Sequence, residues 1–165
     1  MNRLILCIGL MNTLTATALS AIIYVWTPVH PLGQFRFVLG LVTLGWLIAG
    51  MNRLRNKVFA GELKVTYGLL FSGGVGLVSA LSFGLVAWIV CSMVPDFWQA
   101  YLADQVRNLE QATGILSTNY SEGTLDRLRS EIQAQSPWSL ILRISLFRFA
   151  WHVLAGLWVG IYFRN

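Results

Sequence analysis

The chain has 165 residues, of which 56% are hydrophobic and 12% are charged. A soluble domain carries about 25% charged residues, so this chain has too little polar surface to coat a water-soluble globule. Its formal net charge of +5 does not indicate a nucleic-acid partner, because the basic residues cluster in one short loop and near the chain ends.

The first two apolar runs are each long enough to cross a bilayer. Residues 4–26 form the first run, and a proline-containing connection follows it. A secretory signal peptide is the alternative for this run, but its apolar part continues beyond the roughly 7–15 residues of a signal h-region. The second run covers 35–52 and ends in a basic stretch with Arg53, Arg55 and Lys57. We expect both runs to be transmembrane helices, because about 20 apolar residues span the hydrocarbon core.

The third and fourth apolar runs enclose a long polar segment. Residues 66–94 form the third run and residues 138–163 the last. Between them, residues 96–136 carry apolar side chains at helical spacing on both sides of a glycine-containing break. These side chains are Trp98, Leu102, Val106 and Leu109, followed by Leu125, Leu128 and Ile132. The sequence therefore predicts an all-α membrane protein, a single transmembrane domain over 1–165, with four transmembrane helices and an extracytoplasmic amphipathic helical hairpin between helices 3 and 4.

The two long connections differ in the sign of their charge. The loop at 52–64 holds four basic residues and one acidic residue, a net charge of +3, whereas 96–136 holds six acidic and three basic residues, a net charge of −3. Lys and Arg are enriched in short cytoplasmic loops, and Arg3 and Arg164 near the chain ends follow the same rule. We therefore expect both termini and the 52–64 loop in the cytoplasm, and the hairpin in the periplasm of a bacterial inner membrane.

Several features follow one another from Arg53 to the end of the chain. A basic turn with Gly61-Glu62-Leu63-Lys64 leads into the third apolar run, Pro95-Asp96-Phe97 closes that run, and the polar segment precedes the last apolar run. This order resembles a bacterial family of small four-helix membrane proteins, the domain of unknown function four-one-nine-nine family, which is common in Bacteroidetes. Val58-Phe59-Ala60 departs from the glycine-rich step of that pattern. The family has no established activity, so the resemblance implies a fold and a membrane but no catalytic residues.

Small residues recur at four-residue spacing in the third apolar run and again in the last. They are Ser72, Gly76, Ala80 and Gly84, followed by Gly156 and Gly160. Lipid offers no hydrophobic drive for helix association, so small residues that allow backbones to approach closely take over. These six residues are candidates for docking another subunit or a second copy, and packing inside the four-helix bundle is the alternative.

Three polar residues interrupt the last apolar run, namely Arg143, Arg148 and His152. A helix over 138–163 is about 39 Å long, which exceeds the hydrocarbon thickness of about 30 Å. If its inner boundary lies near the end of the run, Arg143 lies at the outer interface and Arg148 about 6 Å inside it. Arg148 can then snorkel to lipid phosphate or toward Asp96, or pair with a carboxylate of another chain if the helix lies deeper. We treat all three residues as candidate contacts with lipid or with a partner.

No sequence pattern of a catalytic or cofactor site occurs, because a Gly-rich phosphate loop, HExxH and GxSxG are all absent. Cys7 and Cys91 do not have metal-site spacing. We expect a non-enzymatic protein without cofactor or metal, an accessory or structural subunit that docks on a larger inner-membrane complex. The alternative is a small-solute or lipid transporter, although such proteins usually show internal repeats and broken helices. The expected partners are membrane lipid and other membrane subunits or a second copy, and not nucleic acid.

Overall fold

The computed structural model describes residues 1–27, 36–59, 61–116 and 122–163, and these residues are almost entirely helical. Six helices lie within this described part of the chain. Their bounds are α1 Asn2–Trp26, α2 Arg36–Val58, α3 Val65–Met93, α4 Pro95–Leu116, α5 Glu122–Gln133 and α6 Pro137–Tyr162. The expectation of an all-α fold is therefore confirmed.

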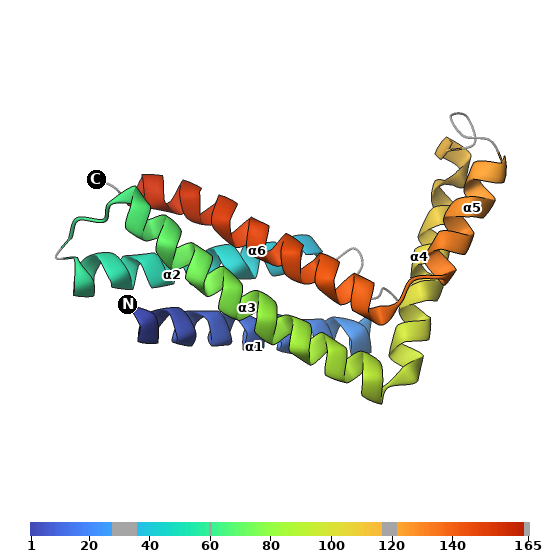
Figure 1. Cartoon of the computed structure of the whole chain (residues 1–165), viewed down its shortest axis with the longest axis horizontal. Helices are drawn as coiled ribbons and strands as arrows, with labels where there is room; N and C mark the ends of the chain where they lie inside the picture. Colours follow the sequence, from blue (N-terminus) through green and yellow to red (C-terminus); the bar gives the residue numbers. More distant parts are fainter. Residues whose placement is uncertain (28–35, 60, 117–121, 164–165) are drawn as a thin grey trace.

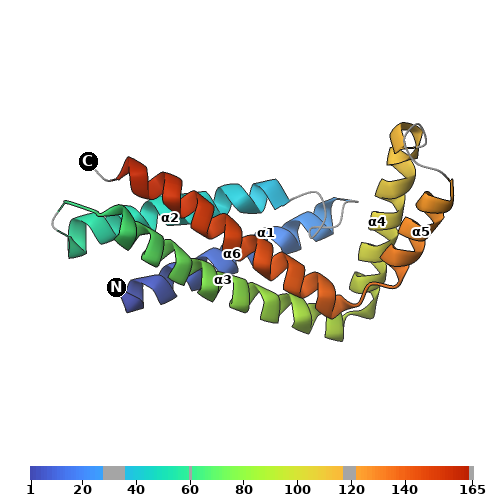
Figure 2. The same cartoon turned by 45° about the horizontal axis from the view of Figure 1, so that its top comes forward.

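Four of the helices lie side by side along the long axis of the molecule, and the other two form an arm at one end (Figure 1). The bundle consists of α1, α2, α3 and α6, whereas α4 and α5 stand across its end as a hairpin arm in both views (Figure 2). The start of α1, the end of α6 and the junction of α2 with α3 lie together at the opposite end. We call these two ends of the bundle the hairpin end and the terminal end.

Three helices of the described chain are long and apolar enough to cross a membrane, namely α1, α3 and α6. They contain 25, 29 and 26 residues, whereas about 20 apolar residues suffice to span the hydrocarbon core. Helix α2 is not among them, and its last turns carry Arg53, Arg55 and Lys57. The described chain thus contains three candidate membrane spans, as a membrane protein would, and a fourth span through α2 stays a prediction.

The basic stretch that we expected to be a loop begins as helix. Helix α2 continues past the predicted end at residue 52 as far as Val58. Asn56 donates a hydrogen bond to the Asn52 side chain at 3.0 Å, and basic residues in a last helical turn are favoured by the negative end of the helix dipole. The chain then turns at Gly61, where Arg55 Nε donates to the Gly61 carbonyl at 2.6 Å. Gly61 has a φ of +102°, which glycine adopts without steric cost.

Helices α3 and α6 make the most extensive helix–helix contact in the described chain. Gly156 of α6 lies against α3, where a Cβ on this residue would be 2.0 Å from Ser72 Oγ. Gly76 of α3 lies against α6 in the same way, because its Cβ would be 2.7 Å from His152 Cβ. Neither position has room for a side chain, so the two backbones approach each other closely.

The small-residue stripe of α3 continues along this contact. A Cβ on Gly84 would lie 2.6 Å from Ser145 Oγ, and the Ala80 carbonyl accepts a hydrogen bond from the same hydroxyl at 3.2 Å. Gly160 faces the α3 backbone at Gly68. All six candidate docking residues therefore lie between α3 and α6, the intramolecular arrangement that the sequence left open. In this structure these six residues are covered by the contact between α3 and α6. Docking of another subunit through them stays a prediction.

The bundle has two apolar cores, one toward each end. Toward the terminal end, Leu47, Met51 and Phe71 are fully buried in one cluster. Toward the hairpin end, a second cluster contains Trp98 and Tyr101 of α4 together with residues of all four bundle helices. The first turns of α4 therefore close the hairpin end and attach the arm to the bundle.

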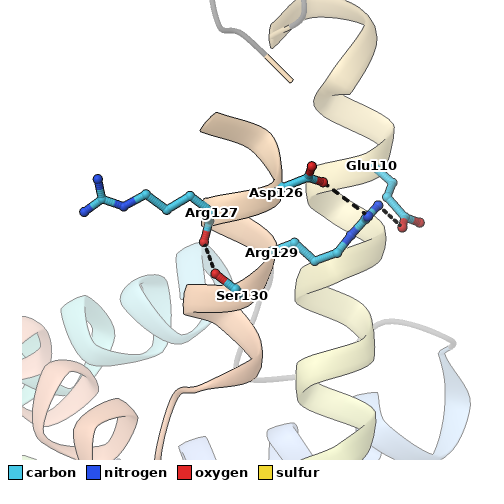
Figure 3. Close-up of polar contacts among 5 residues, drawn as sticks. All are labelled: Glu110, Asp126, Arg127, Arg129 and Ser130. Atoms are coloured by element: carbon cyan, nitrogen blue, oxygen red, sulfur yellow. Dashed lines mark hydrogen bonds and ion pairs between the residues drawn. The ribbon is translucent and has the colours of Figure 1, made fainter. Parts of the chain in front are cut away.

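Helices α4 and α5 pack against each other as an antiparallel pair (Figure 1). Arg129 of α5 joins them, with NH2 3.0 Å from Glu110 Oε1 of α4 and NH1 3.8 Å from Asp126 Oδ1 of α5 (Figure 3). Arg127 Nε lies 2.9 Å from Glu131 Oε1 within α5. Exposed ion pairs of this kind each contribute about 0–1 kcal/mol, so they set the register of the arm more than its stability.

We expect Gly156→Ala to destabilise the bundle, because the new methyl group would overlap Ser72 Oγ at 2.0 Å and Ser72 Cβ at 2.2 Å. The free energy of unfolding should fall by about 1–3 kcal/mol, the usual cost of overpacking. Titration with SDS in detergent micelles, followed by helical circular dichroism, measures this loss. Gly73→Ala is the matched control, since no heavy atom lies within 4 Å of its Cβ position. Equal stability of the two variants would contradict the α3–α6 packing.

Candidate functional site

Buried polar side chains from all four bundle helices meet in the middle of the bundle. Asn12 of α1, Thr43 of α2, Ser79 of α3 and His152 of α6 are each at most 2% exposed. A buried polar group costs free energy unless it is hydrogen-bonded, and each of these four has a partner within the group. We call these residues the polar cluster.

Asn12 connects the polar cluster. Its Nδ2 donates to Ser79 Oγ at 3.0 Å and lies 2.9 Å from His152 Nε2. Its Oδ1 accepts from Thr43 Oγ1 at 3.4 Å. One side chain of α1 is therefore bonded to each of the other three bundle helices.

The hydrogen bonds of His152 assign its tautomer. Nδ1 lies 2.6 Å from the carbonyl oxygen of Arg148, which can only accept, so Nδ1 carries the proton. Nε2 faces the Asn12 amide donor and therefore accepts. With both ring nitrogens used in this way, the imidazole is neutral and acts as a fixed structural partner of Asn12.

Arg148 of α6 turns into the bundle, toward α3. Its side chain is 7% exposed, and NH2 donates to Ser79 Oγ at 3.2 Å. The guanidinium carbon lies 4.3 Å from the centre of the Phe83 ring, a cation–π contact. The charge is thus held inside the bundle instead of reaching outward to the surface.

The charge of Arg148 has no carboxylate partner in the described part of the chain. The carboxylates of Glu110, Asp126 and Glu131 pair with Arg127 and Arg129 in the hairpin arm. Arg148 Nε is buried without a hydrogen-bond partner, although a guanidinium has several N–H donors to satisfy. Removing an ion from water costs several kcal/mol, so an anion beside this group would be strongly favoured.

Arg148 lines a cavity of about 240 Å³ toward the hairpin end, with walls from α2, α3, α4 and α6. The lining residues are Leu39, Gly40, Thr43, Phe83, Tyr101, Gln105, Leu140, Arg143, Ile144, Phe147, Arg148 and Trp151. We call this space the arginine cavity. Two of its aromatic lining residues, Phe147 and Trp151, are exposed on α6.

Arg143 is the second cation of the arginine cavity. It precedes Arg148 by five residues, which places it about 7.5 Å nearer the hairpin end along the helix axis. Its side chain is exposed, and NH2 donates to Gln135 Oε1 at 3.3 Å. Trp151 Nε1 donates to the Gly40 carbonyl at 3.3 Å and ties α6 to α2 beside the cavity. The cavity therefore has one buried and one exposed cation. Both lie on α6, which this hydrogen bond holds against α2.

A second cavity of about 190 Å³ lies between α1 and α3 and shares Phe83 with the first. No charged residue lines it, so it offers less chemistry than the arginine cavity. Within the described ranges, no group of three or more His, Cys, Asp or Glu lies together as a metal site would require. Cys91 is buried in the bundle and Cys7 is exposed on α1.

The polar lining of the arginine cavity combines positive charge with amide and hydroxyl groups, of which the Thr43 hydroxyl already donates to Asn12. It comprises the guanidinium groups of Arg143 and Arg148, the Gln105 amide and the hydroxyls of Thr43 and Tyr101. No lining residue is acidic. Guanidinium groups bind phosphate and carboxylate through paired hydrogen bonds, so the arrangement is suited to holding an anion.

The polar residues that the sequence marked in the last apolar run divide between two places. His152 belongs to the polar cluster, whereas Arg143 and Arg148 line the arginine cavity. Sequence reasoning missed Asn12, Thr43 and Ser79. The signal was an amide within the first apolar run and a hydroxyl within each of the next two, since polar side chains in transmembrane helices hydrogen-bond across to neighbouring helices.

Comparison with family models, with curated proteins and with solved structures finds no match for this chain. The family resemblance drawn from the sequence features therefore stays an expectation.

Proposed function

We propose that this chain is a non-enzymatic integral membrane protein that binds an anionic ligand in the arginine cavity. The observation that supports this most directly is Arg148, a cation that is 7% exposed, lacks a carboxylate partner among the described residues and has an unpartnered Nε. Its surroundings have a low dielectric constant, which strengthens its attraction to an anion. Arg143 adds a second positive charge to the same cavity.

Binding fits the cavity better than catalysis or transport does. A catalytic site needs a nucleophile or an acid–base pair, and the lining offers neither a carboxylate nor an imidazole. A transport path would have to continue toward the terminal end. There Leu47, Met51 and Leu54 fill the bundle with no exposed surface. The cavity is therefore suited to holding a ligand near one side of the membrane.

In this proposal α2 is the fourth span, and the terminal end of the bundle faces the cytoplasm. Helix α2 packs against α1 and α6 along the bundle, which supports its crossing the membrane together with them. The basic 52–64 segment lies at the terminal end and the acidic 96–136 segment at the hairpin end (Figure 1). The positive-inside rule then places the hairpin arm in the periplasm of a bacterial inner membrane.

An accessory subunit of a larger inner-membrane complex is the second candidate function. The hairpin arm favours it, because α5 contacts α4 and stands clear of the bundle (Figure 2). The outer part of this arm does not pack against the bundle, so its surface can contact another subunit. Both functions can belong to one protein, since the arginine cavity lies within the bundle and the outer part of the arm lies away from it.

Arg148→Gln should remove the stabilising effect of an anionic ligand. The thermal unfolding midpoint of the natural protein in neutral detergent should rise with sodium phosphate, with phosphatidylglycerol in mixed micelles, or with both. A ligand that binds the folded state contributes about 2.7 kcal/mol at one hundred times its Kd. Arg127→Gln changes an exposed arginine of the arm and should behave like the natural protein. If neither probe gives a shift that depends on Arg148, the anion site is wrong.

Single cysteines in place of Lys57 and Glu110 should react from opposite sides of the membrane. Both positions are exposed, one near the terminal end and one on the arm. The background carries Cys7→Ser and Cys91→Ser, and the reagent is a membrane-impermeant maleimide applied to right-side-out and to inverted vesicles. We expect Glu110→Cys to react in right-side-out vesicles and Lys57→Cys in inverted ones. Labelling of both positions from the same side would overturn the topology.

The accessory role predicts that the protein, extracted from its own membrane in mild detergent, migrates in fixed ratio with larger subunits on native-size analysis. Arg129→Glu should release the protein from the larger subunits, because this change reverses the charge that bridges Glu110 and Asp126 on the arm. Lys57→Glu makes the same charge change at the terminal end and should leave the association intact. Extraction as a lone protein would remove the accessory role and leave ligand binding in place.

A further inference from the structure

We propose that the ligand of the arginine cavity is the head group of an anionic phospholipid, which reaches Arg148 sideways from the bilayer past Phe147 and Trp151 of α6. This inference rests on the proposed anion site and deepens it by naming the ligand class. Phosphate is the shared chemistry of a lipid head group and a free inorganic anion. The surroundings of the cavity favour the lipid.

The exposed residues that line the arginine cavity are two aromatic side chains and Arg143. Phe147 is 53% exposed and Trp151 is 39% exposed, and both lie on α6 at the edge of the cavity. In a bundle that spans a membrane, exposed apolar side chains of this kind face hydrocarbon. A ligand that passes these side chains must be soluble in the hydrocarbon region of the bilayer. A phospholipid meets this condition, and a small soluble anion does not.

Helix α4 covers the cavity on the side that faces water. Tyr101 is 6% exposed, and Gln105, one turn later on α4, is half-buried. Both line the cavity from the hairpin end. A solute approaching from the outer aqueous phase therefore meets a helix that is packed into the bundle, whereas a lipid in the outer leaflet meets Phe147 and Trp151 on the exposed face of α6.

The depths of Arg143 and Arg148 in the bilayer suit a phosphate group that lies just below the membrane surface. With the inner end of α6 at the inner boundary of the hydrocarbon, the outer boundary falls near Ile144, so that Arg143 lies just outside it and Arg148 about 6 Å inside it. Side chains on a helix tilt toward its N-terminus, which for α6 is the hairpin end. The guanidinium of Arg148 lies between Ser79 and Phe83 of α3, and Phe83 is one turn nearer the hairpin end. A phosphate must therefore be drawn inward from the outer boundary to reach it.

The charge of the lining selects among head groups. No acidic residue lines the cavity, so a zwitterionic head group would bring its ammonium group close to Arg143 without a counter-ion. A phosphate with a neutral polyol lacks this repulsion. The Gln105 amide supplies a hydrogen-bonding group for such a polyol. Phosphatidylglycerol therefore fits better than phosphatidylcholine or phosphatidylethanolamine.

Native mass spectrometry of the delipidated full-length protein in neutral detergent tests the inference. The probes are phosphatidylglycerol, phosphatidylcholine with the same chains, and inorganic phosphate. Phosphatidylglycerol should fill one saturable site with a Kd about tenfold lower than that of phosphatidylcholine, and Arg148→Gln should raise this Kd about tenfold. Arg143→Gln should raise it less than about fivefold because this side chain is exposed. Arg127→Gln should leave it unchanged.

A second variant keeps the test decisive if Arg148→Gln does not fold. Gln105→Trp adds volume to the cavity from α4 without changing any charge or any residue of the polar cluster. It should abolish the saturable phosphatidylglycerol site while the helical circular dichroism spectrum stays the same. An unchanged site in this variant would mean that the lipid binds elsewhere.

The possible outcomes separate the two proposals. Binding of inorganic phosphate that depends on Arg148, without a preference for phosphatidylglycerol, overturns the lipid inference and leaves the anion site standing. Equal binding of phosphatidylglycerol by the natural protein and by Arg148→Gln identifies a general boundary lipid and also overturns it. If no probe binds in a manner that depends on Arg148, the lipid inference and the proposed function fall together.

Discussion

Between α3 and α6 the backbones approach so closely that a Cβ on Gly156 would lie 2.0 Å from Ser72 Oγ. In lipid, where apolar side chains gain little by leaving one apolar surface for another, such close contact is the main source of attraction between helices. The same closeness brings Ser79 of α3 within 3.2 Å of Arg148 NH2 on α6 and places Gly76 against His152. The polar cluster and the buried charge therefore depend on small residues that carry no chemistry of their own.

The polar cluster specifies which faces of the helices turn inward. An apolar helix that is hydrophobic on every side gives packing little reason to prefer one rotation over another. Asn12 removes this ambiguity, because its amide bonds to Ser79, His152 and Thr43 at once. A shift of α1 by one residue would turn the amide by about 100° and leave it facing hydrocarbon without partners. Within the bundle, the polar cluster thus fixes a register that apolar packing alone leaves open.

The sequence predicted the elements well and their mutual orientation poorly. Run lengths and polar breaks located α1, α3 and α6 to within a few residues, because lipid demands long apolar segments. The end of α2 was placed too early, since Arg53 and Lys57 signal the membrane boundary but do not end a helix. The sequence did not predict that the Arg148 side chain points into the bundle. This direction depends on Ser79 and Phe83, which lie on a helix whose rotation no periodic pattern defines.

In the proposed anion site, Arg148 connects the ligand to the arrangement of the whole bundle. Its contact with Phe83 contributes about 0.5–2 kcal/mol, less than the several kcal/mol that burying a charge costs. The balance shifts toward the folded state when an anion neutralises the guanidinium. Ser79 Oγ accepts from both Arg148 and Asn12, and Asn12 is bonded to the other three bundle helices. An anion that holds Arg148 in place therefore acts through Ser79 on the one side chain that joins all four helices, so that binding at one end strengthens the packing of the centre.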